Sequence, residues 1–274
     1  GISGVRAHNM NVTRGIFSMF PRDNRAVRVV ASTIILMFAA AGWATTAAAE
    51  ELTMMAAVNM AGRQRMLTQR MVKAYCQINL DVRRDEAREQ LAQAVAQFDS
   101  QLTELKRFAP TLKVSESLAV ADGLWVPFRK IITSPYSREN AEQVMVLNEN
   151  LLQASQLVVT QLETLSGRPA ARLVNIAGRQ RMLSQRIAKF YMLRELGFQT
   201  PLVLDGLNSV KGEFLAAHAE LRASPRNTDE INRLLDGVNL QWQLLDYSIS
   251  NKTVSLVEFV ALTTEKIVQA MDQA

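Results

Sequence analysis

The chain has few of the side chains that most enzymes and metalloproteins need. It holds one cysteine, Cys76, and beyond residue 49 one histidine, His218. A single cysteine excludes an intrachain disulfide, so core packing must stabilise the fold. There is no His/Cys metal-ligand set, no glycine-rich phosphate loop and no Ser-His-Asp combination. The sequence therefore predicts a protein that is not an enzyme and uses no metal or cofactor.

Net charge is also scarce beyond the first 49 residues. Residues 1–49 contain five arginines and one acid, whereas residues 50–274 contain 26 basic and 25 acidic side chains. Proteins that bind duplex nucleic acid need several clustered phosphate contacts. A nearly neutral body does not supply such a field, and we predict no nucleic-acid partner.

One long apolar run is present, over residues 29–41. It follows a basic stretch that ends at Arg28, and it precedes small residues that end in Ala47-Ala48-Ala49. These parts are typical of a secretory signal peptide, so we predict one over residues 1–49, with the rest of the chain exported to the periplasm. The alternative is an anchor in the inner membrane, because residues 27–49 are just long enough to span ~30 Å of hydrocarbon.

The sequence repeats itself at an interval of 116 residues. Residues 58–75 read VNMAGRQRMLTQRMVKAY and residues 174–191 read VNIAGRQRMLSQRIAKFY, with 13 of 18 positions identical. Fixed-interval similarity indicates repeated structural units, and this interval is about the length of a small domain. We predict two helical repeats, over residues 50–166 and 167–274.

Helix is the only secondary structure that the apolar pattern supports. Apolar residues recur at alternating steps of three and four, which lays one stripe on a helix. Ser137 and Thr228 are expected as N-caps, and Pro127 is expected to kink its helix or to delay its start. The predicted fold class is all-α, with two tandem up-down four-helix bundles. The predicted helices lie near 51–80, 82–109, 117–133, 138–166, 170–196, 202–223, 228–249 and 254–273.

Each copy of the repeated motif holds three arginines and a lysine within eleven residues and no acid. The arginines alternate with apolar residues, so some must approach a core or an interface. An unpaired buried charge is strongly destabilising, and arginine's planar fork suits oxyanions. Gly62 and Gly178 lie within helices, where glycine costs about 1 kcal/mol relative to alanine, but it permits another helix or a ligand to come close.

Two interpretations of these arginines stay open on the residues alone. One is a bound anion held between helices. The other is an internal network of ion pairs with acids of neighbouring helices, for which the candidates are Glu142, Glu149, Asp236 and Asp246.

The motif Asn-x-Ala-Gly-Arg-Gln-Arg-Met-Leu-Ser/Thr-Gln-Arg resembles that of the type IV pili methyl-accepting chemotaxis transducer N-terminal domain. That domain is in turn similar to the periplasmic sensor domain of nitrate/nitrite sensor histidine kinases, whose helix reads Ala-Gly-x-x-Arg-Met-x-Ser-x-Arg. The match is tight over about 18 residues in each half. In the nitrate sensors, the arginine before the methionine from each of two subunits grips one nitrate.

The resemblance implies that the two bundles form a pseudo-dimer, with the helices near 51–80 and 170–196 face to face and a ligand site built from both copies of the motif. The arginine before the methionine is Arg65 in the first copy and Arg181 in the second. The chain departs from the nitrate sensors at Arg63-Gln64 and Arg179-Gln180, which leaves room for a larger or more highly charged anion. The implied ligand-binding residues are Arg65, Arg181, Gly62, Gly178, Arg63, Arg179, Arg70 and Arg186.

The functional prediction is an exported, non-enzymatic sensor that binds a small oxyanion such as nitrate or nitrite between its two arginine-bearing helices. No second apolar span and no kinase or methyl-accepting segment follows, so the expected partner for signalling is a membrane receptor or a histidine kinase. The alternative is a helical scaffold that docks such a receptor, or a pilus-linked chemosensory partner, without a small ligand.

Overall fold

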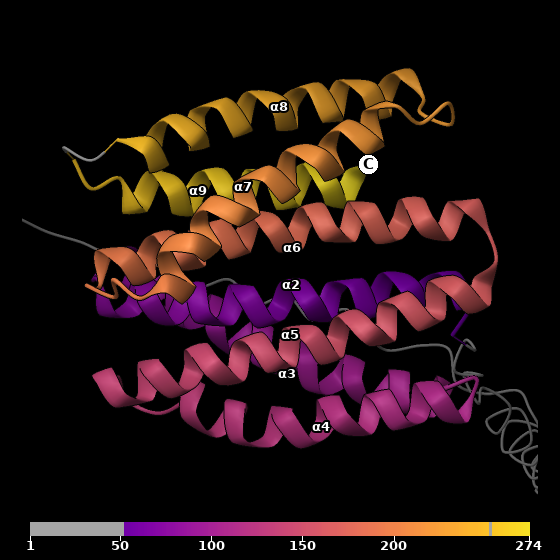
Figure 1. Ribbon diagram of the computed structural model, residues 1–274, viewed down its shortest axis with the longest axis horizontal. Coiled ribbons are helices and arrows are strands. Elements are labelled where there is room, and N and C mark those ends of the chain that lie inside the picture. Colours follow the sequence, from indigo (N-terminus) through magenta and orange to yellow (C-terminus); the bar gives the residue numbers. More distant parts are fainter. Residues whose placement is uncertain (1–51, 252–253) are drawn as a thin grey trace, which may run out of the picture. The chain divides into compact units, whose positions relative to one another are not determined.

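Eight helices make up the residues that the computed structural model describes, 52–251 and 254–274, and no strand occurs among them (Figure 1). Every predicted helix is present, which confirms the all-α fold class. The helices are α2 (Met54–Asn79), α3 (Arg84–Phe108), α4 (Leu112–Ile132), α5 (Arg138–Ser166), α6 (Pro169–Glu195), α7 (Pro201–Arg222), α8 (Asp229–Ser250) and α9 (Val257–Gln273).

Helix ends follow the local capping chemistry of the sequence. The predicted N-caps Ser137 and Thr228 are confirmed, since each hydroxyl accepts a hydrogen bond from the backbone N–H three residues on. Gly167 ends α5 with a φ of 59°, a conformation that glycine adopts at little cost, and Pro169 opens α6.

Helix α4 differs from its prediction. It begins at Leu112 and not at 117, because Thr111 caps its first turn by accepting from the N–H of Val114. The expectation that Pro127 delays this start is therefore wrong. Pro127 lies inside the helix on an exposed face, where the carbonyl that its missing N–H leaves unpaired can be hydrated.

The helices form two four-helix bundles with the same order of packing. In the first, α2 packs on α3 and α5, and α4 packs on α5; in the second, α6 packs on α7 and α9, and α8 packs on α9. The most extensive contact joins α2 to α6 across the two bundles. Figure 1 shows these two helices at the centre, with α3–α5 on one side and α7–α9 on the other. This is the predicted pseudo-dimer.

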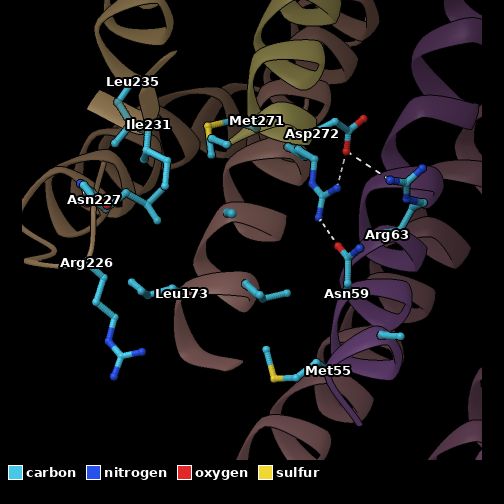
Figure 2. Close-up of a pocket in the computed structure, with 16 residues that line it drawn as sticks. Met55, Asn59, Arg63, Leu173, Arg226, Asn227, Ile231, Leu235, Met271 and Asp272 are labelled. Carbon is cyan, nitrogen blue, oxygen red and sulfur yellow. Dashed lines mark hydrogen bonds and ion pairs between the residues drawn. The ribbon is translucent and has the colours of Figure 1, made fainter. Parts of the chain in front are cut away.

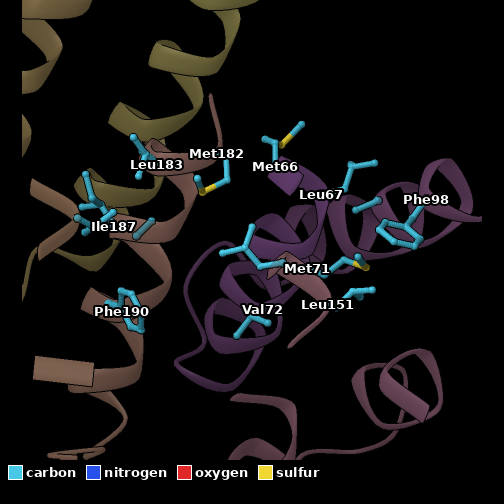
Figure 3. Packing of buried hydrophobic residues seen from close by; sticks show 14 of the residues in the cluster. Met66, Leu67, Met71, Val72, Phe98, Leu151, Met182, Leu183, Ile187 and Phe190 are labelled. Atoms are coloured by element: carbon cyan, nitrogen blue, oxygen red, sulfur yellow. The ribbon is translucent and has the colours of Figure 1, made fainter. Parts of the chain in front are cut away.

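Buried apolar side chains fill both bundles and the seam between them. Met66, Met71, Met182 and Ile187 from the two central helices belong to this core (Figure 3). Each bundle adds an aromatic pair, Phe98 on Trp125 with ring centroids 4.2 Å apart and Phe214 on Trp242 at 4.6 Å. The two bundles therefore belong to one compact unit over residues 52–274.

Two predictions stay predictions here. The signal peptide over residues 1–49, with its alternative as an anchor over 27–49, falls outside the described residues. The division into domains at residues 166 and 167 is also untested. Among the described helices, none is both long enough and apolar enough to cross a bilayer.

Candidate functional site

Helices α2 and α6 approach each other closely at the two motif glycines. A Cβ atom placed on Gly178 would lie 3.5 Å from the Cα of Gly62, and one placed on Gly62 would lie 3.8 Å from the Cα of Gly178. Such backbone proximity is what glycine within a helix permits. The two copies of the motif therefore meet within one chain.

Arg65 lies at this glycine contact and is fully buried, with 0% of its surface exposed. Its Nη1 donates to Oε1 of Gln156 at 2.6 Å, and its Nη2 donates to Oδ1 and the carbonyl oxygen of Asn175 at 2.7 and 3.1 Å. Its Nε has no partner. All the protein partners of this cation are therefore neutral.

Arg181 occupies the equivalent place on α6 and is 4% exposed. Its Nη2 donates to Oδ1 of Asn59 at 2.8 Å, which mirrors the bond from Arg65 to Asn175. Its Nη1 donates to the carboxylate of Asp272, and its Nε has no partner. The second copy thus pairs its arginine with a carboxylate, which the first copy does not do.

The two guanidinium groups converge on one point. The position of a Cβ on Gly178 lies 3.3 Å from Nη2 of Arg65 and 3.5 Å from Nη2 of Arg181. Burial, with the nearby charges of Arg179 and Arg181, lowers the pKa of Arg65 to about 9, and burial also lowers the pKa of Arg181. Positive charge is therefore poorly compensated where the copies meet.

Two more of the candidate arginines, Arg63 and Arg179, lie further out. Arg63 is paired with Asp272 at 3.2 Å, so this carboxylate bridges Arg63 and Arg181. Arg179 is paired with Glu213 at 2.9 Å on the surface. Both add positive charge near Arg65 and Arg181, but the structure shows no hydrogen bond from either of them to these two arginines.

A cavity of about 460 Å³ opens beside Arg181 (Figure 2). Asn59, Arg63, Arg181 and Asp272 line one end of it. The rest of its wall is mainly apolar and is contributed by α2, α6, α7, α8 and α9, with Arg226 and Asn227 from the connection between α7 and α8. This cavity brings solvent to the Arg181 side of the α2–α6 seam.

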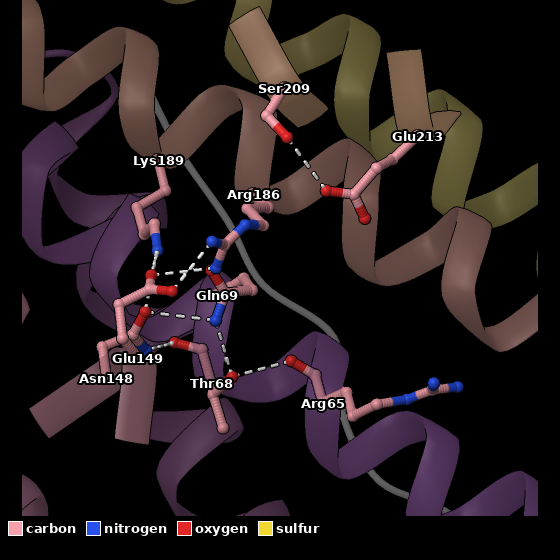
Figure 4. Close-up of polar contacts among 9 residues, drawn as sticks. All are labelled: Arg65, Thr68, Gln69, Asn148, Glu149, Arg186, Lys189, Ser209 and Glu213. Carbon is pink, nitrogen blue, oxygen red and sulfur yellow. Dashed lines mark hydrogen bonds and ion pairs between the residues drawn. The ribbon is translucent and has the colours of Figure 1, made fainter. Parts of the chain in front are cut away.

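The later arginines of the motif have carboxylate partners. Nη1 and Nη2 of Arg186 donate to the two oxygens of Glu149, both at 2.8 Å, and Nζ of Lys189 donates to the same carboxylate at 2.6 Å (Figure 4). In the other copy, Arg70 and Lys73 pair with Glu265. The interpretation of an internal ion-pair network therefore holds for Arg70 and Arg186.

These ion pairs cross between the bundles. Glu149 lies on α5 of the first bundle and pairs with α6 of the second, while Glu265 lies on α9 and pairs with α2. Of the candidate acids that the sequence offered, Glu149 is such a partner, whereas Glu142, Asp236 and Asp246 pair with arginines or lysines outside the motif. The interval of 116 residues relates Glu149 to Glu265, Asn59 to Asn175 and Gln156 to Asp272.

Cys76 and His218, whose side-chain types are common in enzyme active sites, are both buried in the helical packing. Cys76 is buried, and burial raises the pKa of its thiol to about 12. The ring of His218 stacks on Phe214 with centroids 6.3 Å apart, and burial lowers its pKa. Within the described ranges, no group of three or more His, Cys, Asp and Glu side chains is placed to hold a metal ion.

Comparison with protein families gives one match, in two segments. The model of the type IV pili methyl-accepting chemotaxis transducer N-terminal domain matches residues 47–160 and again residues 164–257. Comparisons with curated proteins and with solved structures found no match. The two matched segments contain the two copies of the motif and cover most of the chain. The chain therefore belongs to the type IV pili methyl-accepting chemotaxis transducer N-terminal family, which it contains in two copies.

Proposed function

We propose that this protein is an exported sensor domain of the chemotaxis-transducer type that binds one small oxyanion between α2 and α6. One observation carries the proposal. Arg65 is fully buried, converges with Arg181 on one point beside Gly178, and has only neutral hydrogen-bond partners.

The energetics favour an anion at this point. A buried charge without a counter-charge is strongly destabilising, whereas a paired and hydrogen-bonded one is tolerated. The Nε atoms of Arg65 and Arg181 have no partner, so both guanidiniums keep unused donors. An oxyanion such as nitrate or nitrite offers planar acceptor geometry to such donors.

The pseudo-dimer gives the duplication a role. In the nitrate sensors that the motif resembles, two subunits each supply one arginine. Here one chain supplies both, Arg65 and Arg181, across the α2–α6 seam. The two glycines keep the helices close enough for both guanidiniums to contact one small anion.

The setting that we propose is the periplasm, with residues 1–49 as the export signal. Because the family is that of a transducer's N-terminal domain, a membrane receptor or histidine kinase is the expected signalling partner. A scaffold without a small ligand is the rival, and it would leave the charge of Arg65 unexplained.

Calorimetric titration of nitrate and nitrite into the purified protein tests the proposal. We expect binding in the native protein, and we expect Arg65→Ala and Arg181→Ala each to abolish it, because each removes half of the convergent pair. Ligand at 100 times its Kd should also stabilise the native protein by about 2.7 kcal/mol.

Arg88→Ala is the matched control, since Arg88 is an exposed arginine of α3 that pairs with Asp85 at 3.3 Å. It should bind like the native protein. Absence of binding to the native protein, or binding that survives both site substitutions, would refute the anion site and leave the scaffold.

A further inference from the structure

The two copies of the motif differ at one partner of the convergent arginines. Gln156 on α5 and Asp272 on α9 are related by the 116-residue interval. Each accepts a hydrogen bond from Nη1 of the arginine in its own copy, Gln156 from Arg65 and Asp272 from Arg181. The same position thus holds a neutral carboxamide in one copy and a carboxylate in the other.

This difference sets the charge of the whole site. Four arginines surround the glycine contact, and three carboxylates accompany them. Asp272 pairs with Arg181 and Arg63, and Glu213 pairs with Arg179. Glu163 accepts a hydrogen bond from Asn175 and acts on Arg65 from beyond it. Four arginines and three carboxylates leave one positive charge in excess, and Arg65 is the arginine of this group whose hydrogen-bond partners are all neutral.

We infer that Gln156 and Asp272 together restrict this site to a monovalent oxyanion. Asp272 forms an internal ion pair with Arg181, whereas the neutral Gln156 leaves the charge of Arg65 for the ligand. The inference rests on the proposed function and goes on to name the charge class of its ligand. Gln156 and Asp272 are the residues that determine this specificity.

Electrostatics in a buried site supports the restriction. At the effective dielectric of a protein surface, unit charges 4 Å apart interact several times more strongly than they do in bulk water. A dianion would be attracted by Arg65 and Arg181 but repelled by the carboxylate of Asp272, which already pairs with Arg181. Selection against a ligand by such repulsion is a general route to specificity.

The carboxamide at position 156 is equally necessary. Its oxygen lies 2.6 Å from Nη1 of Arg65, so a carboxylate there would form a second internal ion pair of the kind that Arg181 makes with Asp272. The site would then be neutral, and a monovalent anion would have no excess charge to bind.

Isosteric substitutions separate charge from shape. Sodium nitrate and sodium sulfate are titrated at pH 7 and equal ionic strength into the native protein, Asp272→Asn, Gln156→Glu and the double variant Gln156→Glu/Asp272→Asn. Asp122→Asn is the control, because it breaks an exposed ion pair with Lys106 on the first bundle.

In the native protein and the control, nitrate binds more tightly than sulfate. Asp272→Asn shifts the ratio of the two affinities toward sulfate by roughly tenfold or more. Gln156→Glu loses nitrate binding while remaining folded by circular dichroism. The double variant moves the carboxylate from one copy to the other, so it recovers the preference for nitrate that general damage to the site would not restore.

The failures of the two proposals are distinguishable. A native protein that binds neither anion overturns the proposed function, and this inference with it. A native protein that binds an anion but prefers sulfate overturns the inference alone. The inference alone also fails if Asp272→Asn leaves the ratio unchanged, or if the double variant behaves like Gln156→Glu.

Discussion

At the scale of single residues, the unusual feature is how many cations the α2–α6 seam buries. Arg65, Lys73 and Lys189 are each at most 2% exposed, and Arg181 is 4% exposed. The two lysines have carboxylate partners and Arg65 has none. The seam therefore buries three cations that are paired with carboxylates and one, Arg65, that is not.

Lys189 allows a test of that electrostatic account through stability. Burial lowers its pKa to about 7, against the opposing effect of Glu149 and with the help of Arg186. An unfolded lysine keeps its proton to a pKa of about 10.4. Above pH 7 the unfolded chain thus holds more protons at this residue, so the free energy of unfolding should rise with pH.

We expect this rise between pH 7 and about 8.5, above which an unfolded thiol ionises while Cys76 keeps its proton, which opposes the trend. Lys189→Met should flatten it in urea unfolding measured across this range. Lys211→Met, which removes a lysine that pairs with Asp246 at the surface, should keep it. An equal slope in the native protein and in Lys189→Met would contradict the role of Lys189.

The sequence predicted Arg65 and Arg181 only through the motif's resemblance to known sensors. Spacing alone left an anion site and an ion-pair network open. The structure shows the network at Arg70 and Arg186, and the anion site at Arg65 and Arg181 stays a proposal. Gln156 and Asp272 lie 91 residues from the arginines that they contact. No local pattern indicates such partners, because tertiary packing brings them together.

At the scale of elements, helix positions were largely predictable and one helix start was not. Periodic apolar residues mark the buried face of each helix, but the first residue of α4, Leu112, is 76% exposed and does not belong to that face. Its capping residue, Thr111, carries the information instead. Polar caps therefore locate helix ends where burial does not.

Three glycines within helices form a graded series for mutation. A Cβ on Gly123 would meet nothing within 4 Å, and one on Gly62 would make ordinary contacts at 3.5 and 3.8 Å. A Cβ on Gly178 would lie 3.3 Å from Nη2 of Arg65, which is a tight contact. That nitrogen donates two hydrogen bonds to Asn175, and these hold it in place.

Alanine is favoured over glycine within a helix by about 1 kcal/mol. Gly123→Ala should therefore raise the free energy of unfolding by up to about that amount, and Gly62→Ala should change it little or raise it. Gly178→Ala should lower it relative to Gly123→Ala and weaken anion binding, because Arg65 must move. Urea unfolding and calorimetry measure both effects, and a Gly178→Ala protein that equals Gly123→Ala in stability and binds normally would contradict this packing.

At the scale of the whole molecule, each bundle supplies one carboxylate that pairs with cations of the other bundle. Glu149 of the first bundle pairs with Arg186 and Lys189 of the second, and Glu265 of the second bundle pairs with Arg70 and Lys73 of the first. Buried ion pairs of this kind are best attested as devices that set the register of an interface. Here they join α5 to α6 and α9 to α2, on both sides of the α2–α6 contact.

The two tandem bundles followed from the repeat, and the pairing of their first helices followed from the resemblance to sensors that pair two subunits. The difference between the copies that faces the central arginines became visible only in the structure. That difference lies at Gln156 and Asp272, outside the motif, and it makes the pseudo-symmetric seam electrically one-sided.

The central claim is that both copies build a single site, and the stoichiometry of nitrate binding tests it most directly. Calorimetry on the purified protein, with its monomeric state checked by sedimentation, should give one nitrate per chain. One site is expected because Arg65 and Arg181 converge on the same point. Two nitrates per chain, one for each copy of the motif, or none at all, would contradict the account.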